Sequence, residues 1–219
     1  MAIFPGSAIP SVADDAYTID NSLRFNEADS AYLSRTPSVA GNRKTWTISF
    51  WVKKSKLDDA DHNGILSVYG AGDNTGFMTL EFIKNTAAPT DGFKVGGWTS
   101  NFLITDQVFR DPSAWYHFVV ACDTTDTTAN DRIKLYVNGD EVTSFGTRNN
   151  PGEDDDTAIN MTSAHHIGEN LEQNDHLGGY LAEFYLIDGT KYAASDFGEL
   201  DSTTNQWIPL DSDDVKDAV

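Results

Sequence analysis

The sequence predicts an all-β protein that forms a single sandwich domain. Three observations support this fold class: short runs of alternating apolar and polar residues, turn-forming residues between those runs, and almost no helical periodicity. Many short strands with hardly a helix are typical of a sandwich or a barrel. The 219 residues fit one large β domain, and a hydrophobic content of 39% can fill its core.

The N-terminal 20 residues differ from the rest of the chain. They contain two prolines and a glycine among small residues and show no sustained period, which predicts an extended arm over Met1–Asp20, with a disordered tail as the alternative. The sandwich is predicted over residues 21–210. Residues 211–219 begin with the acidic stretch Asp211-Ser212-Asp213-Asp214, and we expect a solvated C-terminal tail there.

The clearest predicted strand spans residues 45–53. One of its faces is apolar and the other is polar, except that Trp51 breaks the alternation, and a period of two marks a half-buried strand. Residues 78–83 alternate in the same way. Residues 115–122 are apolar on both faces, so we place this strand in the centre of a sheet.

The second half of the chain contains the strongest hairpin signal. Residues 133–137 alternate and lead into Asn138-Gly139, a pair suited to the two positive φ angles of a type I′ turn. We expect the return strand over residues 142–145. A last long strand is predicted over 178–187, and one helical turn over 191–197.

The sequence argues against binding to nucleic acid and against insertion into a membrane. The formal net charge is −19, whereas binding to nucleic acid through phosphates needs clustered Lys and Arg. No apolar stretch approaches the length of a membrane span, and no signal peptide is recognisable, so we expect synthesis in a cytoplasm. The single cysteine, Cys122, lies in an apolar run and is expected to be buried.

Several of these segments, taken in order, resemble the laminin-G and pentraxin-like branch of the concanavalin A-like jelly rolls. Each motif is weak alone, but five in this order are specific for the fold. The segments are Ser22–Asn26 with Ala31–Leu33, Trp46–Lys53, Trp115–Val120, Leu135–Gly139, and His166–Gly168 with Gly178–Glu183. The resemblance implies the two-sheet antiparallel jelly-roll sandwich that lectins and glucanases share.

A narrower resemblance is to structural proteins of marine tailed phages, especially those that infect cyanobacteria. It is carried by Tyr32–Pro37 with Gly41–Trp46, by Val108–His117 and Phe197–Glu199, and by the first five residues. In that family such domains lie in head fibres, decoration proteins or tail fibres. The resemblance implies a virion protein whose Met1–Asp20 arm contacts other virion proteins, and a homo-oligomer, for which we expect a trimer.

Catalysis is not expected. Glycanases of this fold use paired carboxylates on one strand that face the same cleft. Glu183 stands alone between Ala182 and Phe184, and Glu81 has no acidic partner two residues away. A non-enzymatic protein is therefore predicted, and a glycanase with carboxylates paired across strands is the remote alternative.

One loop has the beginning of a calcium-binding pattern. Asp59, Asp61 and Asn63, followed by Gly64, match the first half of an oxygen-donor loop that wraps a hard cation. The twelfth position is Gly70, where an EF-hand requires a bidentate Glu, so a complete EF-hand is excluded. A weaker calcium site is one hypothesis, and a solvated loop is the other.

Carbohydrate binding needs an exposed aromatic ring with amides or carboxylates beside it. Trp98, with Asn101 close by in the chain, fits this description, and Trp51 lies on the polar side of its strand. Trp46 and Trp115 are expected in the core. The alternative to a purely structural virion protein is thus an adhesin for glycans on the host surface.

Overall fold

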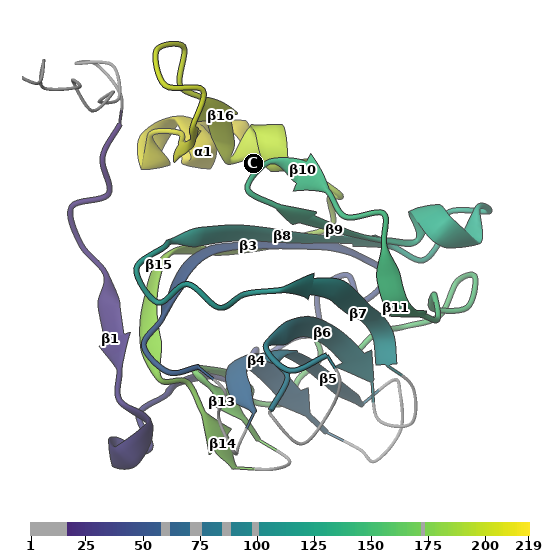
Figure 1. Cartoon of the computed structure of the whole chain (residues 1–219). Helices are drawn as coiled ribbons and strands as arrows, with labels where there is room; N and C mark the ends of the chain where they lie inside the picture. The colour runs from purple at the N-terminus through teal and green to yellow at the C-terminus, as the bar shows by residue number, and fades with distance from the viewer. Residues whose placement is uncertain (1–16, 58–61, 71–75, 85–88, 98–100, 172–173) are drawn as a thin grey trace, which may run out of the picture.

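The structure is a computed structural model, and it describes residues 17–57, 62–70, 76–84, 89–97, 101–171 and 174–219 (Figure 1). In this part of the chain two antiparallel sheets pack face to face, which confirms the predicted sandwich. The helix α1 and the strand β16 lie over one sheet, on its side away from the other sheet (Figure 1).

One sheet contains six of the described strands. Across the sheet their order is β1 (Leu23–Phe25), β15 (Gly179–Asp188), β3 (Thr45–Lys54), β8 (Tyr116–Asp123), β9 (Ile133–Val137) and β10 (Asp140–Glu141).

The other sheet contains seven. Their order is β11 (Phe145–Arg148), β7 (Asn101–Val108), β6 (Gly92–Gly97), β5 (Phe77–Phe82), β4 (Asn63–Tyr69), β12 (His165–Ile167) and β2 (Leu33–Arg35).

Smaller elements complete the described fold. Two short strand pairs are β13 (Glu169–Asn170) with β14 (Asp175–His176), and β16 (Gly198–Leu200) with β17 (Trp207–Pro209). The helical segments are the 3-10 turns η1 (Glu27–Asp29), η2 (Ala129–Asp131) and η3 (Ala194–Asp196), and the α-helix α1 (Ser212–Ala218). None of the helices in the described ranges could cross a membrane.

The core lies between the two sheets and is rich in aromatic rings. Phe50 of β3 stacks on Phe118 of β8, with ring centroids 5.6 Å apart, and Phe118 in turn stacks on Phe93 of β6 at 4.3 Å. The apolar face predicted for residues 45–53 is confirmed, because its four side chains are fully buried: Trp46, Ile48, Phe50 and Val52. Each such burial stabilises the fold by roughly 1.5–3 kcal/mol.

The opposite face of β3 is not solvated, contrary to the half-buried strand that its alternation predicts. Thr47 and Ser49 are buried, because the segment from Thr190 onward packs across this face. Thr47 donates a hydrogen bond to the Thr190 carbonyl and accepts one from the Tyr192 amide. The six-stranded sheet is therefore covered on both faces, which makes a third layer.

The predicted C-terminal tail contributes to this third layer. Asp211 caps α1 by accepting a hydrogen bond from the Asp213 amide, and Val215 is 1% exposed against Val119 and Phe197. The acidic side chains of Asp213 and Asp214 are exposed, as expected for a solvated face.

The predicted Asn138-Gly139 hairpin is confirmed. The two residues have φ angles of 49° and 89°, and Val137 pairs with Asp140 across the turn. The return strand is misplaced in the prediction: it is β10, directly after the turn, while Phe145 already begins β11 in the other sheet. Residues 142–144 thus connect β10 in one sheet to β11 in the other. The helical turn expected over 191–197 is present as η3.

Candidate functional site

Three tryptophans meet on the outer face of the six-stranded sheet. Trp51 comes from β3, Trp115 directly precedes β8, and Trp207 belongs to β17. Together with residues 17–22, Ala182 and Pro209 they line a hollow of about 350 Å³, which we call the tryptophan hollow. The hollow thus lies between the six-stranded sheet, the third layer and the end of the predicted N-terminal arm.

His117 holds two of these tryptophans in place. It lies opposite Trp51 in the β3–β8 register, and the two rings stack with centroids 4.8 Å apart. Trp207 stacks on the same histidine at 6.0 Å and donates its Nε1–H to His117 Nδ1 at 3.0 Å. Because Nδ1 accepts, Nε2 carries the proton and donates to Ser49 Oγ, 2.8 Å away. Burial lowers the pKa of His117 to about 3, so the ring is neutral near pH 7.

The three tryptophans differ in exposure. Trp51 is 7% exposed, whereas Trp115 is 36% exposed and meets Tyr180 edge-on at 6.5 Å. Trp51 therefore forms the base of the hollow and Trp115 its open wall. The expectation that Trp115 lies in the core is wrong, because β8 begins only at Tyr116 and Trp115 belongs to the preceding loop. Trp46 is fully buried, as expected.

The remaining wall of the hollow is polar. Thr18, Asp20, Asn21 and Ser22 line it and are exposed. Their hydroxyl, carboxylate and amide groups are the donors and acceptors that orient a polar ligand over an apolar base.

Glu183 anchors this wall to β15. Tyr17 donates its hydroxyl to Glu183 Oε1 at 3.4 Å, and Tyr185 donates to the other carboxylate oxygen. Burial, followed by the bond to Glu183, raises the pKa of the Tyr185 hydroxyl. Glu183 itself has a φ of 45°, at the bulge where the β15–β3 register shifts. The bulge turns this carboxylate toward the incoming arm.

The comparisons with known proteins agree with this architecture. A family model described as the concanavalin A-like lectin/glucanases superfamily, of the laminin-G type, matches residues 26–195. The chain belongs to this superfamily. No curated protein matches the chain.

Solved structures with this concanavalin A-like fold include three that the chain resembles at low identity. Tailspike protein 2 of the Escherichia coli bacteriophage CAB120 has 14% identity and a TM-score of 0.55, over 82% of this chain and 24% of that one. Domains LG4-5 of the mouse laminin α1 chain have 11% identity and a TM-score of 0.51, over 86% and 48%. The binding domain of botulinum neurotoxin serotype D has 15% identity and a TM-score of 0.50, over 84% and 43%.

These similarities show the fold alone. The concanavalin A-like chain described here spans less than half the length of each of the three proteins.

Two of the three predicted sugar-binding residues, Trp51 and Asn101, lie in different sheets. Trp98 lies outside the described residues. Asn101 begins β7 in the seven-stranded sheet, where its carbonyl accepts a hydrogen bond from the Asn149 side chain, while Trp51 belongs to the other sheet. Of the two described residues of the predicted group, Trp51 lines the tryptophan hollow and Asn101 does not.

Trp207 and His117 were not predicted as site residues. Trp207 follows the last predicted strand, and its place over β3 depends on the third layer, which local periodicity does not reveal. The Trp115-Tyr116-His117 run carries the family resemblance but indicates a strand rather than a site.

Of the three predicted calcium ligands, the structure describes only Asn63. Asp59 and Asp61 lie outside the described residues, and Asn63 is 2% exposed at the start of β4, where its Oδ1 accepts a hydrogen bond from the Gly178 amide. In the described ranges no three His, Cys, Asp or Glu side chains are grouped to hold a metal.

The two isolated glutamates also have partners. Glu81 is fully buried and accepts hydrogen bonds from Lys94 and Asn170, whereas Glu183 accepts from Tyr17 and Tyr185. They come from different sheets.

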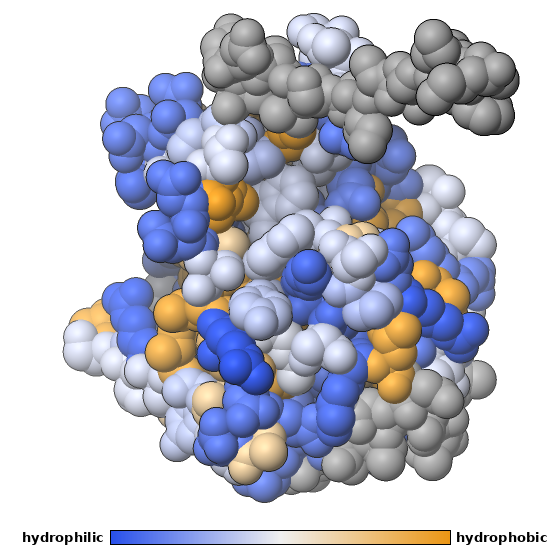
Figure 2. Space-filling view, turned by 60° about the vertical axis from the view of Figure 1, so that its left-hand side comes forward, coloured by the Kyte–Doolittle hydropathy of each residue, from blue (hydrophilic) through white to orange (hydrophobic). Residues whose placement is uncertain are grey.

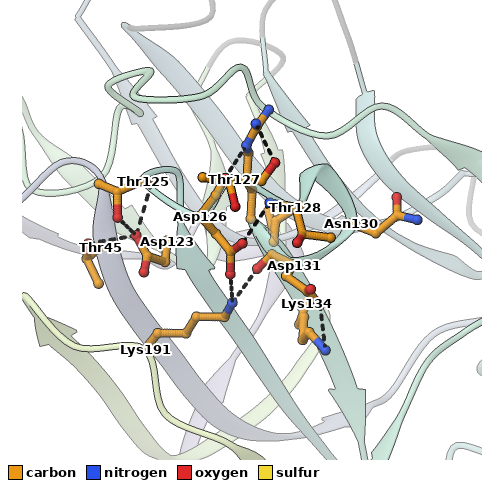
Figure 3. A network of polar contacts seen from close by, with 12 residues as sticks. Thr45, Asp123, Thr125, Asp126, Thr127, Thr128, Asn130, Asp131, Lys134 and Lys191 are labelled. Atoms are coloured by element: carbon orange, nitrogen blue, oxygen red, sulfur yellow. Dashed lines mark hydrogen bonds and ion pairs between the residues drawn. The ribbon is translucent and has the colours of Figure 1, made fainter.

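The acidic loop between β8 and β9 is a polar network (Figure 3). Asp123 accepts hydrogen bonds from Thr125 and from Thr45 of β3; although partial burial acts to raise the pKa of Asp123, these bonds outweigh it and lower the pKa. Lys191 donates to the Asp131 carbonyl and lies 4.0 Å from the Asp126 carboxylate. These contacts tie the loop to the third layer, so we assign the network a structural role.

Proposed function

We propose that this domain is a non-enzymatic carbohydrate-binding module and that the tryptophan hollow is its sugar site. The observation that carries the proposal is the pairing of an exposed ring, Trp115, with a rigid base of Trp51 and Trp207. A sugar stacks the apolar face of its ring on an aromatic side chain, and polar groups beside it select the hydroxyls. Residues 18–22 supply such groups at the rim.

The base of the hollow is rigid, which favours its interpretation as a binding site. His117 fixes Trp207 by a hydrogen bond and by stacking, so these rings lose little freedom when a ligand arrives. A volume of about 350 Å³ is near the lower end of ligand pockets, which fits the end of a glycan better than a long stretch of it.

Charge narrows the class of sugar. The chain carries a net charge of −19, and Asp20 lies at the rim of the hollow. Acidic sugars would be repelled by this field, so neutral sugars are the ligands that we propose.

As part of the same proposal, the module is displayed on the particle of a tailed phage and binds glycans on the host surface. The support is the resemblance of Tyr32–Trp46 and Val108–His117 to phage structural proteins, together with the tailspike among the structures of similar fold. A head fibre, a decoration protein and a tail fibre all fit this position. Immunogold labelling of purified particles, with an antibody against the domain, tests it.

The sugar site is tested with a glycan array of neutral and acidic glycans, followed by calorimetry on the best ligand. We expect Trp115→Ala to weaken binding at least tenfold and to lower the melting temperature only slightly, because Trp115 is the most exposed of the three tryptophans. Trp115→Tyr should retain much of the affinity, since it keeps an aromatic face. Leu200→Ala, an exposed apolar residue of β16, is the matched control.

Two results would contradict the proposal. One is the absence of binding to any glycan. The other is binding that Trp115→Ala leaves intact, which would place the sugar elsewhere and return attention to Trp98.

A further inference from the structure

One side of the sandwich is open between its two sheets. β1 pairs only with Gly179–Leu181, so the rest of the outer edge of β15 has no strand beside it among the described residues. On the facing sheet the edge strand is β2, which is three residues long. The two edges leave a groove that runs along β15.

The floor of the groove is mostly apolar, with polar side chains such as Arg35, Asn160 and Asp188 along it. The groove consists of two adjoining hollows of about 490 and 220 Å³, which share Leu33, Ile167 and Phe184. Phe184 and Leu186 of β15 pack on the main core and also line the groove, so the core reaches the surface here. Figure 2, which brings the side of β1 forward, shows hydrophobic surface in recesses between hydrophilic rims.

The rim of the groove adds exposed apolar surface. Leu23 is 55% exposed, Leu33 48% and Val39 78%. Groups of exposed apolar side chains beside a groove mark interaction sites on soluble proteins.

The open edge of β15 also offers backbone hydrogen-bonding groups. The Gly189 amide bonds inward to the Thr45 carbonyl, and bonding directions alternate along an antiparallel strand. The backbone N–H and C=O groups of Ile187, which pairs with Thr47, therefore point toward β3. Those of Leu186 and Asp188 point the other way, into the groove. An edge strand of this kind is a template for one more strand.

We propose that this groove binds residues 1–16 from a second copy of the chain, as an added strand beside β15. The segment is long enough, since 16 extended residues reach about 50 Å. It is rich in small residues, carries Ile3, Phe4, Ile9 and Val12, and contains no Lys or Arg. These side chains suit a shallow apolar groove, and its acidic end, Asp14-Asp15, complements Arg35 at the rim.

The path of the chain favours a second copy over the same one. Asn21, Ser22 and Ala182 line both the groove and the tryptophan hollow, so residues 21–22 form the wall between the two. Followed from there toward the N-terminus, the chain lines the hollow as far as Tyr17, which donates a hydrogen bond to Glu183. Between residues 22 and 17 the chain thus runs away from its own groove, and exchange of the preceding residues between copies would close a symmetric oligomer.

The first test is the oligomeric state of the full-length protein by light scattering. We expect an oligomer that Val39→Glu dissociates, with at least a tenfold loss of self-association, because a charge then stands at the apolar rim. Val39 is exposed, so this variant should keep its melting temperature. Leu200→Glu, also exposed but on β16, should remain oligomeric. A monomeric wild-type protein, or equal behaviour of the two variants, would overturn the proposal.

Disulfide trapping identifies the occupant. Cys122 is buried, and burial raises the pKa of its thiol, so it does not interfere. Mixed under oxidising conditions, Ile9→Cys chains should cross-link to affinity-tagged Val39→Cys chains and not to tagged Leu200→Cys chains. If the double variant Ile9→Cys/Val39→Cys instead forms a disulfide within one chain, the segment binds its own groove and the exchange is rejected.

This inference is independent of the sugar site. Trp115→Ala should leave self-association unchanged, and Val39→Glu should leave the affinity of a single hollow for its glycan unchanged. Failure of one proposal therefore leaves the other standing.

Discussion

The histidine at the base of the tryptophan hollow is held without a charge. Protonation of His117 would place a cation among buried rings and would remove the acceptor that Trp207 Nε1 uses. These costs explain why burial lowers its pKa to about 3, whereas an unfolded histidine titrates near 6.5. Between these pH values the unfolded chain binds a proton that the folded chain does not. The contribution of neutral His117 to the free energy of unfolding is therefore fully present above about pH 6.5 and is lost as the pH falls toward 3.

His117→Gln should flatten the acid side of the stability profile. The wild-type protein is expected to lose up to about 1.4 kcal/mol per pH unit from this residue below pH 6.5, and the variant lacks that term. At neutral pH the variant should be the less stable protein, because it loses the stacking on Trp51 and Trp207. Urea unfolding followed by tryptophan fluorescence at several pH values measures both effects. Parallel profiles for the two proteins would show that His117 does not carry the acid sensitivity.

Among the secondary-structure elements, those with a local sequence signal were predicted and those that depend on distant packing were not. The predicted strands at residues 45–53 and 178–187 and the Asn138-Gly139 turn are present, because alternation and positive φ are properties of adjacent residues. The helix α1 was not predicted, because seven residues are too few to be helical alone and its single buried side chain, Val215, has no visible period.

The same dependence on distant packing explains why the candidate site was predicted only in part. Trp51 was singled out because it breaks a local pattern, but its partner Trp207 lies 156 positions later and reaches it only through the third layer. The exposure of Trp115 depends on where β8 begins, and strand boundaries are the least predictable part of an apolar run.

The stability of α1 should depend on its cap. Asp211→Ala removes the side chain that accepts from the Asp213 amide, and we expect a loss of about 1 kcal/mol in the free energy of unfolding. Asp217→Ala, in the last turn of the same helix, is the matched control and should have little effect, because an acidic side chain there opposes the helix dipole. Chemical denaturation of both variants makes the comparison. If Asp211→Ala is as stable as the Asp217→Ala control and the wild-type protein, the cap contributes nothing and packing on Val119 and Phe197 holds α1.

For the molecule as a whole, the dominant property is its negative charge. At −19 the folded chain repels itself, and the ion pairs at its surface, such as Lys216 with Asp213, contribute little in return. Salt screens this repulsion over about 10 Å at 0.1 M and about 3 Å at 1 M. We therefore expect the melting temperature to rise with sodium chloride.

The same titration tests the calcium hypothesis for Asp59, Asp61 and Asn63. A cation that binds the folded state stabilises it by mass action, beyond any screening. If the site exists, millimolar calcium chloride should raise the melting temperature more than sodium chloride of equal ionic strength, and Asp61→Asn should abolish the excess. Asp213→Asn, which removes the same charge from α1, should retain it. Equal effects of the two salts on the wild-type protein would leave charge screening as the whole explanation and would remove calcium from the account of this domain.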